Sequence, residues 1–206
     1  MGVEFNKNGI GGDFPVFWRG ECKVLPGDYK LKQTFAEGDL LRKGTPLQID
    51  FENMEAGVVK VAKVLAGGTT AKPRVVKGSL LKSGDVVMKL GKNDLSPSVS
   101  SIDTSNSDYD VITLSAAITG LAEGAFLQEC SAYVPAAGEV AAVPSVPLYV
   151  PDAVIETNKE YSLNGFQTVS AGYDVLILKC VAYPVPSEWL EGFSLKNNHS
   201  IKYVKQ

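Results

Sequence analysis

Few residues of this chain have the types and spacing that catalysis or metal binding requires. The single histidine, His199, lies in the polar stretch 197–200, which is more typical of a surface residue than of a catalytic base. The cysteines Cys22, Cys130 and Cys180 are far apart, whereas a zinc site needs about four closely spaced ligands. The sequence therefore predicts no catalytic residue and no metal site.

Two further patterns invite a ligand-binding interpretation but do not meet its requirements. The glycine-rich stretch 9–12 lacks the preceding strand, the following helix and the third glycine of a dinucleotide-binding fingerprint. Asp103, Asp108 and Asp110 lack the residue order of a calcium-binding EF-hand loop, so a polar connecting loop is favoured. We therefore expect no cofactor.

Two functional alternatives remain open from the residues alone. A β-rich enzyme is one, because any two carboxylates can meet in space and form a glycosidase pair. A carbohydrate-binding β module is the other, because aromatic side chains can form a stacking platform, although these fit a core or an interface better: Trp18, Tyr149, Tyr173 and Trp189.

The composition narrows the class of protein. Hydrophobic residues make up 45% and charged residues 21% of the chain, as in ordinary globular proteins. The net charge of −3 lacks the basic surplus of a nucleic-acid binder. No apolar run approaches the ~20 residues of a membrane-spanning helix, and the N-terminus does not resemble a signal peptide. We expect neither nucleic acid nor membrane as a partner, and the odd cysteine count fits a reducing cytoplasm.

The pattern of turns and apolar runs predicts a mainly β fold. The 20 glycines and 11 prolines divide the chain into short pieces rich in β-branched and aromatic residues. One short helix is predicted over 188–191, N-capped by Ser187 and closed by Gly192. The clearest predicted strands span 58–65, 110–114, 172–182 and 200–204.

A short pattern recurs along the chain. Residues 38–47 match residues 78–87 at an offset of 40, and a looser third copy spans 121–127. The first two copies indicate a strand, a tight turn, a glycine at positive φ and a second strand, which is the pattern of a hairpin. Because so few copies cannot form a solenoid, we expect equivalent hairpins within one compact β unit.

Composition divides the chain into four segments. Residues 1–36 form an N-terminal arm, 37–134 a β domain and 148–206 a C-terminal β segment. The stretch between the last two, 135–147, is rich in alanine and proline and is expected to be a semi-rigid linker.

The arm contains the candidate partner-binding residues. Phe14, Phe17 and Trp18 stand beside Arg19, directly after the glycine-rich stretch. Aromatic residues and arginine are enriched where proteins bind one another. The rings can equally fill the core of the chain itself, so both roles remain open.

The hairpin pattern and the C-terminal stretch together resemble bacteriophage head decoration and head-fibre proteins. The resemblance rests on residues 44–50, 63–68 and 75–87, and on 169–175 followed by the proline-flanked segment at 184–186. It implies a β-clip-like decoration domain of short strands and glycine hairpins, followed by the C-terminal β segment with its short helix. It also implies a homotrimer that binds the major capsid protein on the outer surface of the head, without catalysis. Such a protein is made in the bacterial cytoplasm and ends in the virion.

Overall fold

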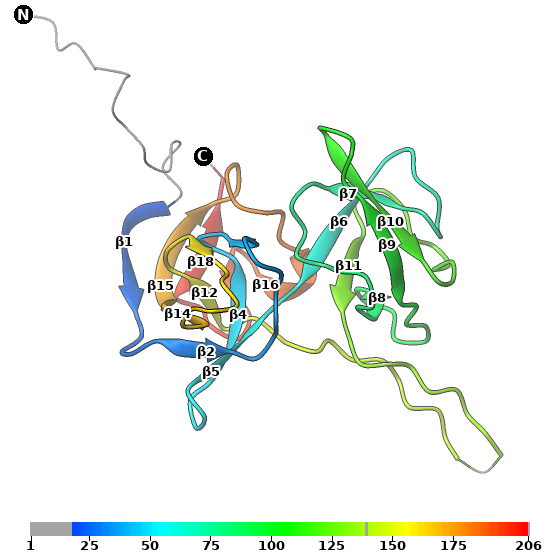
Figure 1. Cartoon of the computed structure of the whole chain (residues 1–206), viewed down its shortest axis with the longest axis horizontal. Coiled ribbons are helices and arrows are strands. Elements are labelled where there is room, and N and C mark those ends of the chain that lie inside the picture. The colour runs from blue at the N-terminus through cyan, green and yellow to red at the C-terminus, as the bar shows by residue number, and fades with distance from the viewer. Residues whose placement is uncertain (1–17, 139, 206) are drawn as a thin grey trace, which may run out of the picture.

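The structure, a computed structural model, describes residues 18–138 and 140–205. These residues form two β lobes side by side, with a thin ribbon projecting from one of them (Figure 1). The helical content of the described residues is a single 3-10 turn, Ser187–Trp189. The predicted mainly β fold is therefore confirmed.

The first lobe is built on a ten-stranded sheet. Its strand order is β14-β2-β5-β4-β12-β15-β18-β17-β16, and β1 pairs with β15. Two further strands, β3 (Leu40–Leu41) and β13 (Lys159–Glu160), pair with each other in a separate two-stranded sheet. The strands of the large sheet are β1 (Trp18–Val24), β2 (Tyr29–Leu31), β4 (Pro46–Asp50), β5 (Glu55–Val58), β12 (Ala153–Ile155), β14 (Thr168–Val169), β15 (Ala171–Leu178), β16 (Leu190–Glu191), β17 (Ser194–Leu195) and β18 (Ile201–Val204).

The second lobe is a six-stranded sheet with the order β8-β11-β6-β7-β10-β9. A bridge between Val86 and Ser98 links the residues that precede its two end strands, so the sheet curls back toward itself. This arrangement leaves little open edge for unwanted pairing. The strands are β6 (Val61–Leu65), β7 (Arg74–Val76), β8 (Val87–Lys89), β9 (Val99–Asp103), β10 (Tyr109–Leu114) and β11 (Phe126–Glu129).

Each lobe encloses its own apolar core, and a third cluster joins them. Alternate residues of β10 are buried, as expected of a strand with one face on a core. The joining cluster includes Val59 and Val61, which flank the crossing between the lobes, and Trp189 and Tyr203 from the C-terminal segment. The Trp189 indole donates a hydrogen bond to Gln128 of the second lobe at 3.2 Å. The C-terminal strands therefore cover the junction between the lobes.

The sheet of the first lobe crosses the segment boundaries that composition suggested. It contains β1 and β2 from the predicted arm, β4 and β5 from the predicted β domain, and β12 with β14–β18 from the predicted C-terminal segment. The order of strands thus depends on pairings between residues more than 100 positions apart, which composition does not encode.

The repeated pattern corresponds to three equivalent turns. The glycines at their centres, each 40 residues apart, all have positive φ: Gly44 (78°), Gly84 (93°) and Gly124 (82°). Each glycine N–H donates to the backbone carbonyl of a residue distant in sequence. The N–H of that same residue donates in return to the carbonyl of the residue that follows the glycine. The three clamped residues are Ile155, Val99 and Val64, with all six N···O distances between 2.7 and 3.0 Å.

The strands on either side of the first turn do not form a hairpin. β3 pairs with β13, whereas β4 pairs with β5 and β12. The positive φ of Gly44 reverses the chain sharply, and the two bonds to Ile155 then hold the turn against β12. The turn signal was correct, but the pairing partner comes from a remote segment.

Three predicted elements differ in detail. The strand predicted over 58–65 is interrupted between β5 and β6, and the strand predicted over 172–182 ends at Leu178. The predicted helix is only the 3-10 turn, because Leu190 is extended (φ −105°, ψ 143°) and Ser187 does not act as a side-chain cap. Gly192, at φ 63°, lies between β16 and β17 instead of closing a helix.

We predict that Gly84→Ala lowers the free energy of unfolding by about 1 kcal/mol, because an L-residue is strained at this φ. An added Cβ at Gly84 would meet nothing within 4 Å, so the loss would report backbone strain alone. Gly165→Ala, whose φ lies outside the left-handed region, is the matched control. Urea denaturation measures both variants, and a Gly84→Ala protein as stable as the control would contradict the assignment.

Candidate interaction site

Residues 131–147, here called the ribbon, project away from the second lobe (Figure 1). Antiparallel bridges join Cys130 to Pro147, Val134 to Val143 and Ala137 to Val140. Residues 135–147, which composition suggested as a linker, thus form part of this two-stranded ribbon. An isolated two-stranded ribbon is only marginally stable in water, so it gains from a partner surface.

Two pairs of backbone hydrogen bonds hold the outer part of the ribbon together. Val134 and Val143 exchange two backbone bonds of 3.0 and 2.9 Å, and Ala137 and Val140 exchange two of 3.1 and 3.0 Å. Pro135 lacks the N–H that a further strand would need, as do Pro144 and Pro147 on the returning side. The ribbon is therefore better suited to contact a partner through its side chains than through strand addition.

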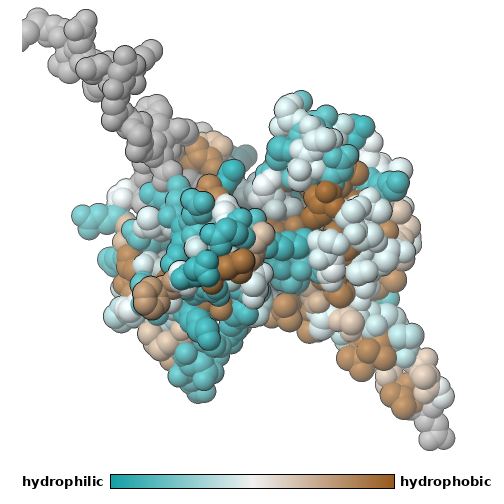
Figure 2. Space-filling view, in the orientation of Figure 1, coloured by the Kyte–Doolittle hydropathy of each residue, from teal (hydrophilic) through white to brown (hydrophobic). Residues whose placement is uncertain are grey.

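The four valines of the ribbon are exposed. Val134, Val140, Val143 and Val146 are between 50% and 67% exposed, and Glu139 is the only charged residue in the segment. Figure 2 shows hydrophobic residues along much of the projection. Single exposed aliphatic residues are ordinary, but a run of them on a projecting element marks an interaction surface.

A buried cluster of charges lies at the root of the ribbon. The ammonium group of Lys60, only 5% exposed, is 2.9 Å from both carboxylate oxygens of Asp85 and 2.9 Å from one oxygen of Glu129. Burial raises the pKa of Glu129, against the lowering effect of Lys60. The carboxylates are 14% and 12% exposed, and they share one cation that ties the crossing between the lobes to the second lobe.

The four predicted partner-binding residues are only partly placed. Phe14 and Phe17 lie outside the described residues. Trp18 and Arg19 belong by their backbone to β1, where they pair with Ile177 and Leu176 of β15. The end of the predicted arm is therefore a strand of the first lobe.

Among the aromatic residues of the carbohydrate-binding alternative, Tyr149, Tyr173 and Trp189 do not form a platform. Tyr149 and Trp189 pack in the cluster that joins the lobes, and Trp189 is only 7% exposed. Tyr173 is exposed on β15. Buried rings cannot stack against a sugar, so the geometry does not support this use of the described members.

The acidic residues at and near the connection from β9 to β10 make local contacts. Asp103 accepts a hydrogen bond from the backbone of Ser105, Asp108 accepts one from Ser107, and Asp110 pairs with Lys77. Over residues 18–138 and 140–205, no group of three or more histidine, cysteine or acidic side chains is placed to hold a metal ion.

The remaining chemically active side chains are dispersed. His199 is exposed and lies 3.4 Å from Glu191, and the three cysteines are free, with Cys130 buried and Cys180 exposed. No helix in the described part of the chain is long and apolar enough to cross a bilayer.

The ribbon was missed by the sequence prediction, although a signal for it exists. Val-Pro pairs recur at 134–135, 143–144 and 146–147, and two Ala-Ala pairs flank the turn that contains Gly138. This near-symmetry about a glycine is typical of a hairpin, whereas the proline content favoured a linker.

The chain matches no known protein in three comparisons: no family model, no curated protein and no solved structure is similar to it.

We predict that Lys60→Met destabilises the protein by about 3–5 kcal/mol, because it leaves two buried carboxylates without their cation. The raised pKa of Glu129 means that the folded state binds this proton more tightly than the unfolded state, so its ionisation opposes folding as pH rises. The loss in the variant should therefore be smaller at about pH 5 than at about pH 8.

Urea denaturation at both pH values measures this effect. Lys23→Met, which breaks the exposed pair with Asp174, is the control and should change stability little. A Lys60→Met protein with wild-type stability, or with a larger loss at the lower pH, would contradict the structural role of the cluster.

Proposed function

We propose that this chain is a structural protein of a bacteriophage virion that binds the outer surface of the head, as a decoration protein or head fibre. The single observation that carries the proposal is the ribbon, which presents four exposed valines and almost no charge. The resemblance of residues 44–50, 63–68 and 75–87 to head decoration and head-fibre proteins supplies the phage context.

The ribbon would bind by placing its valines in an apolar groove of the major capsid protein. Full burial of a valine side chain is worth about 1.5 kcal/mol, so four half-exposed valines contribute about 3 kcal/mol. A micromolar complex needs about 8 kcal/mol. One ribbon alone is therefore too weak an attachment.

A homotrimer would meet this shortfall. Three ribbons on one particle convert the later contacts into intramolecular events, and their combined strength exceeds that of each contact by orders of magnitude. The predicted arm residues Phe14, Phe17, Trp18 and Arg19 are a second proposed contact with the shell. Light scattering tests the trimer, and a monomeric mass at micromolar concentration would contradict it.

The carbohydrate-binding alternative ranks lower. Two of its four aromatic residues, Tyr149 and Trp189, belong to the cluster between the lobes. No specific contact of the described residues favours a sugar over a protein surface as the partner.

The proposal predicts that replacing three ribbon valines by serine, as Val134→Ser, Val140→Ser and Val143→Ser together, lowers the affinity for undecorated phage heads at least tenfold. The thermal midpoint should change little, because these side chains are exposed in the free protein. Co-sedimentation with heads, followed by electron microscopy, measures the binding.

The matched control carries Phe51→Ser and Phe193→Ser, which remove exposed apolar side chains from the first lobe. This control should bind heads as the wild type does. If the ribbon variant also binds at wild-type strength, the ribbon is not the attachment site. If the wild-type protein binds no head, the proposed function itself fails.

A further inference from the structure

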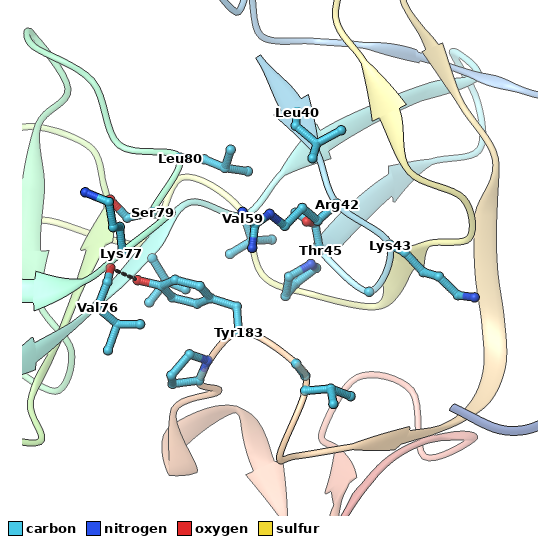
Figure 3. A pocket seen from close by; sticks show the side chains of 17 residues that line it. Leu40, Arg42, Lys43, Thr45, Val59, Val76, Lys77, Ser79, Leu80 and Tyr183 are labelled. Carbon is cyan, nitrogen blue, oxygen red and sulfur yellow. Dashed lines mark hydrogen bonds between the residues drawn. The ribbon is translucent and has the colours of Figure 1, made fainter. Parts of the chain in front are cut away.

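A pocket of about 210 Å³ opens between the two lobes (Figure 3). Its walls come from residues 40–46 of the first repeat, 76–80 at the start of the second repeat and 181–184 after β15, with Val59 and Val61 at the crossing. Segments that are well separated in sequence thus meet at one site.

The lining of the pocket is basic although the chain as a whole is acidic. Arg42, Lys43 and Lys77 line it, and none of its lining residues is an aspartate or a glutamate. Lys77 is already paired with Asp110 at 3.0 Å, and Figure 3 shows the side chain of Lys43 directed away from the pocket centre. Arg42 is therefore the cation that faces the pocket.

The guanidinium group of Arg42 is available to a ligand. It extends between the lobes (Figure 3), where a Cβ added to Gly78 would lie 3.9 Å from its central carbon. Within the described part of the chain, the exposed Arg42 side chain has no hydrogen-bond or ion-pair partner.

The rest of the pocket lining is mostly apolar, with Thr45 and Ser79 as its aliphatic hydroxyl side chains. Val59 and Leu80 lie beside Arg42, and Val181 and Pro184 contribute the side formed by the C-terminal segment. The hydroxyl of Tyr183 donates to the carbonyl of Val76 at 3.1 Å, which fixes the ring as a wall and occupies its polar end. The pocket therefore combines one planar cation with hydrophobic surface.

We propose that this pocket binds a carboxylate attached to an apolar body. A guanidinium group pairs with a carboxylate through two parallel hydrogen bonds, and the apolar walls accept the rest of the ligand. The volume is below the roughly 300–1,000 Å³ of pockets for drug-sized ligands. The ligand is accordingly a small hydrophobic acid or the C-terminal residue of a polypeptide, which share this chemistry.

Isothermal titration calorimetry of the full chain at low salt tests the proposal with N-acetyl-L-phenylalanine and its neutral amide. The acid should bind at least tenfold more tightly than the amide, and Arg42→Gln should abolish this preference. Arg42→Lys, which keeps the charge but not the paired geometry, should retain part of it. Lys92→Gln, at an exposed lysine outside the pocket, should behave as the wild type.

Any one of three results would overturn the proposal. These are equal affinity for the acid and the amide, an acid preference that survives in Arg42→Gln, and no binding of the acid at millimolar concentration. A tripeptide with a free C-terminal phenylalanine distinguishes the two sources. Tighter binding of the tripeptide than of N-acetyl-L-phenylalanine assigns the pocket to a polypeptide end, and equal binding assigns it to a small acid. Both results support the shared chemistry, and neither depends on binding to phage heads.

Discussion

The arrangement of this protein depends on the buried ion cluster around Lys60. Lys60 lies between β5 of the first lobe and β6 of the second, where the chain passes from one to the other. Its ammonium group binds Asp85 of the second glycine turn and Glu129 at the end of β11. A buried cluster of this kind adds little net stability but penalises every arrangement that leaves a charge unpaired.

The same cluster fixes the root of the ribbon. The backbone N–H of Glu129 donates to the carbonyl of Lys60, and its carbonyl accepts from Leu148, directly after the ribbon. The neighbouring residue Cys130 donates to Val86, two residues beyond the second turn. The exposed, apolar ribbon is thus attached to a part of the molecule that ion pairs and backbone hydrogen bonds hold in place. Such a base suits a contact whose direction matters.

Local patterns predicted the local features of the fold. Runs of β-branched and apolar residues between turns identified β10 and β18, and the recurring glycine pattern identified the positive-φ turns at Gly44 and Gly84. Pairing partners were not predictable, because Ile155, which clamps the first turn, is more than 100 residues away in sequence. The break between β5 and β6 was missed because, in the sequence alone, Lys60 resembles a solvent-facing residue within a strand. Its burial becomes evident only when Asp85 and Glu129 are seen beside it.

The candidate site was the least predictable part. The proline content of residues 135–147 suggests a linker, and only the pairing of Val134 with Val143 reveals the two-stranded ribbon. The pocket around Arg42 was equally hidden, since it requires the two lobes to be placed side by side. Both sites consist of common residue types. Only the folded structure shows that the ribbon valines are exposed and that Arg42 faces a pocket.

Hydrogen–deuterium exchange at the amides of Val134, Val140 and Val143, with the protein free and bound to phage heads, tests the central claim most directly. These amides bond only across the ribbon, so they should exchange readily in the free protein and at least tenfold more slowly on the head. Unchanged exchange in the ribbon of protein that is demonstrably bound to heads would contradict the account.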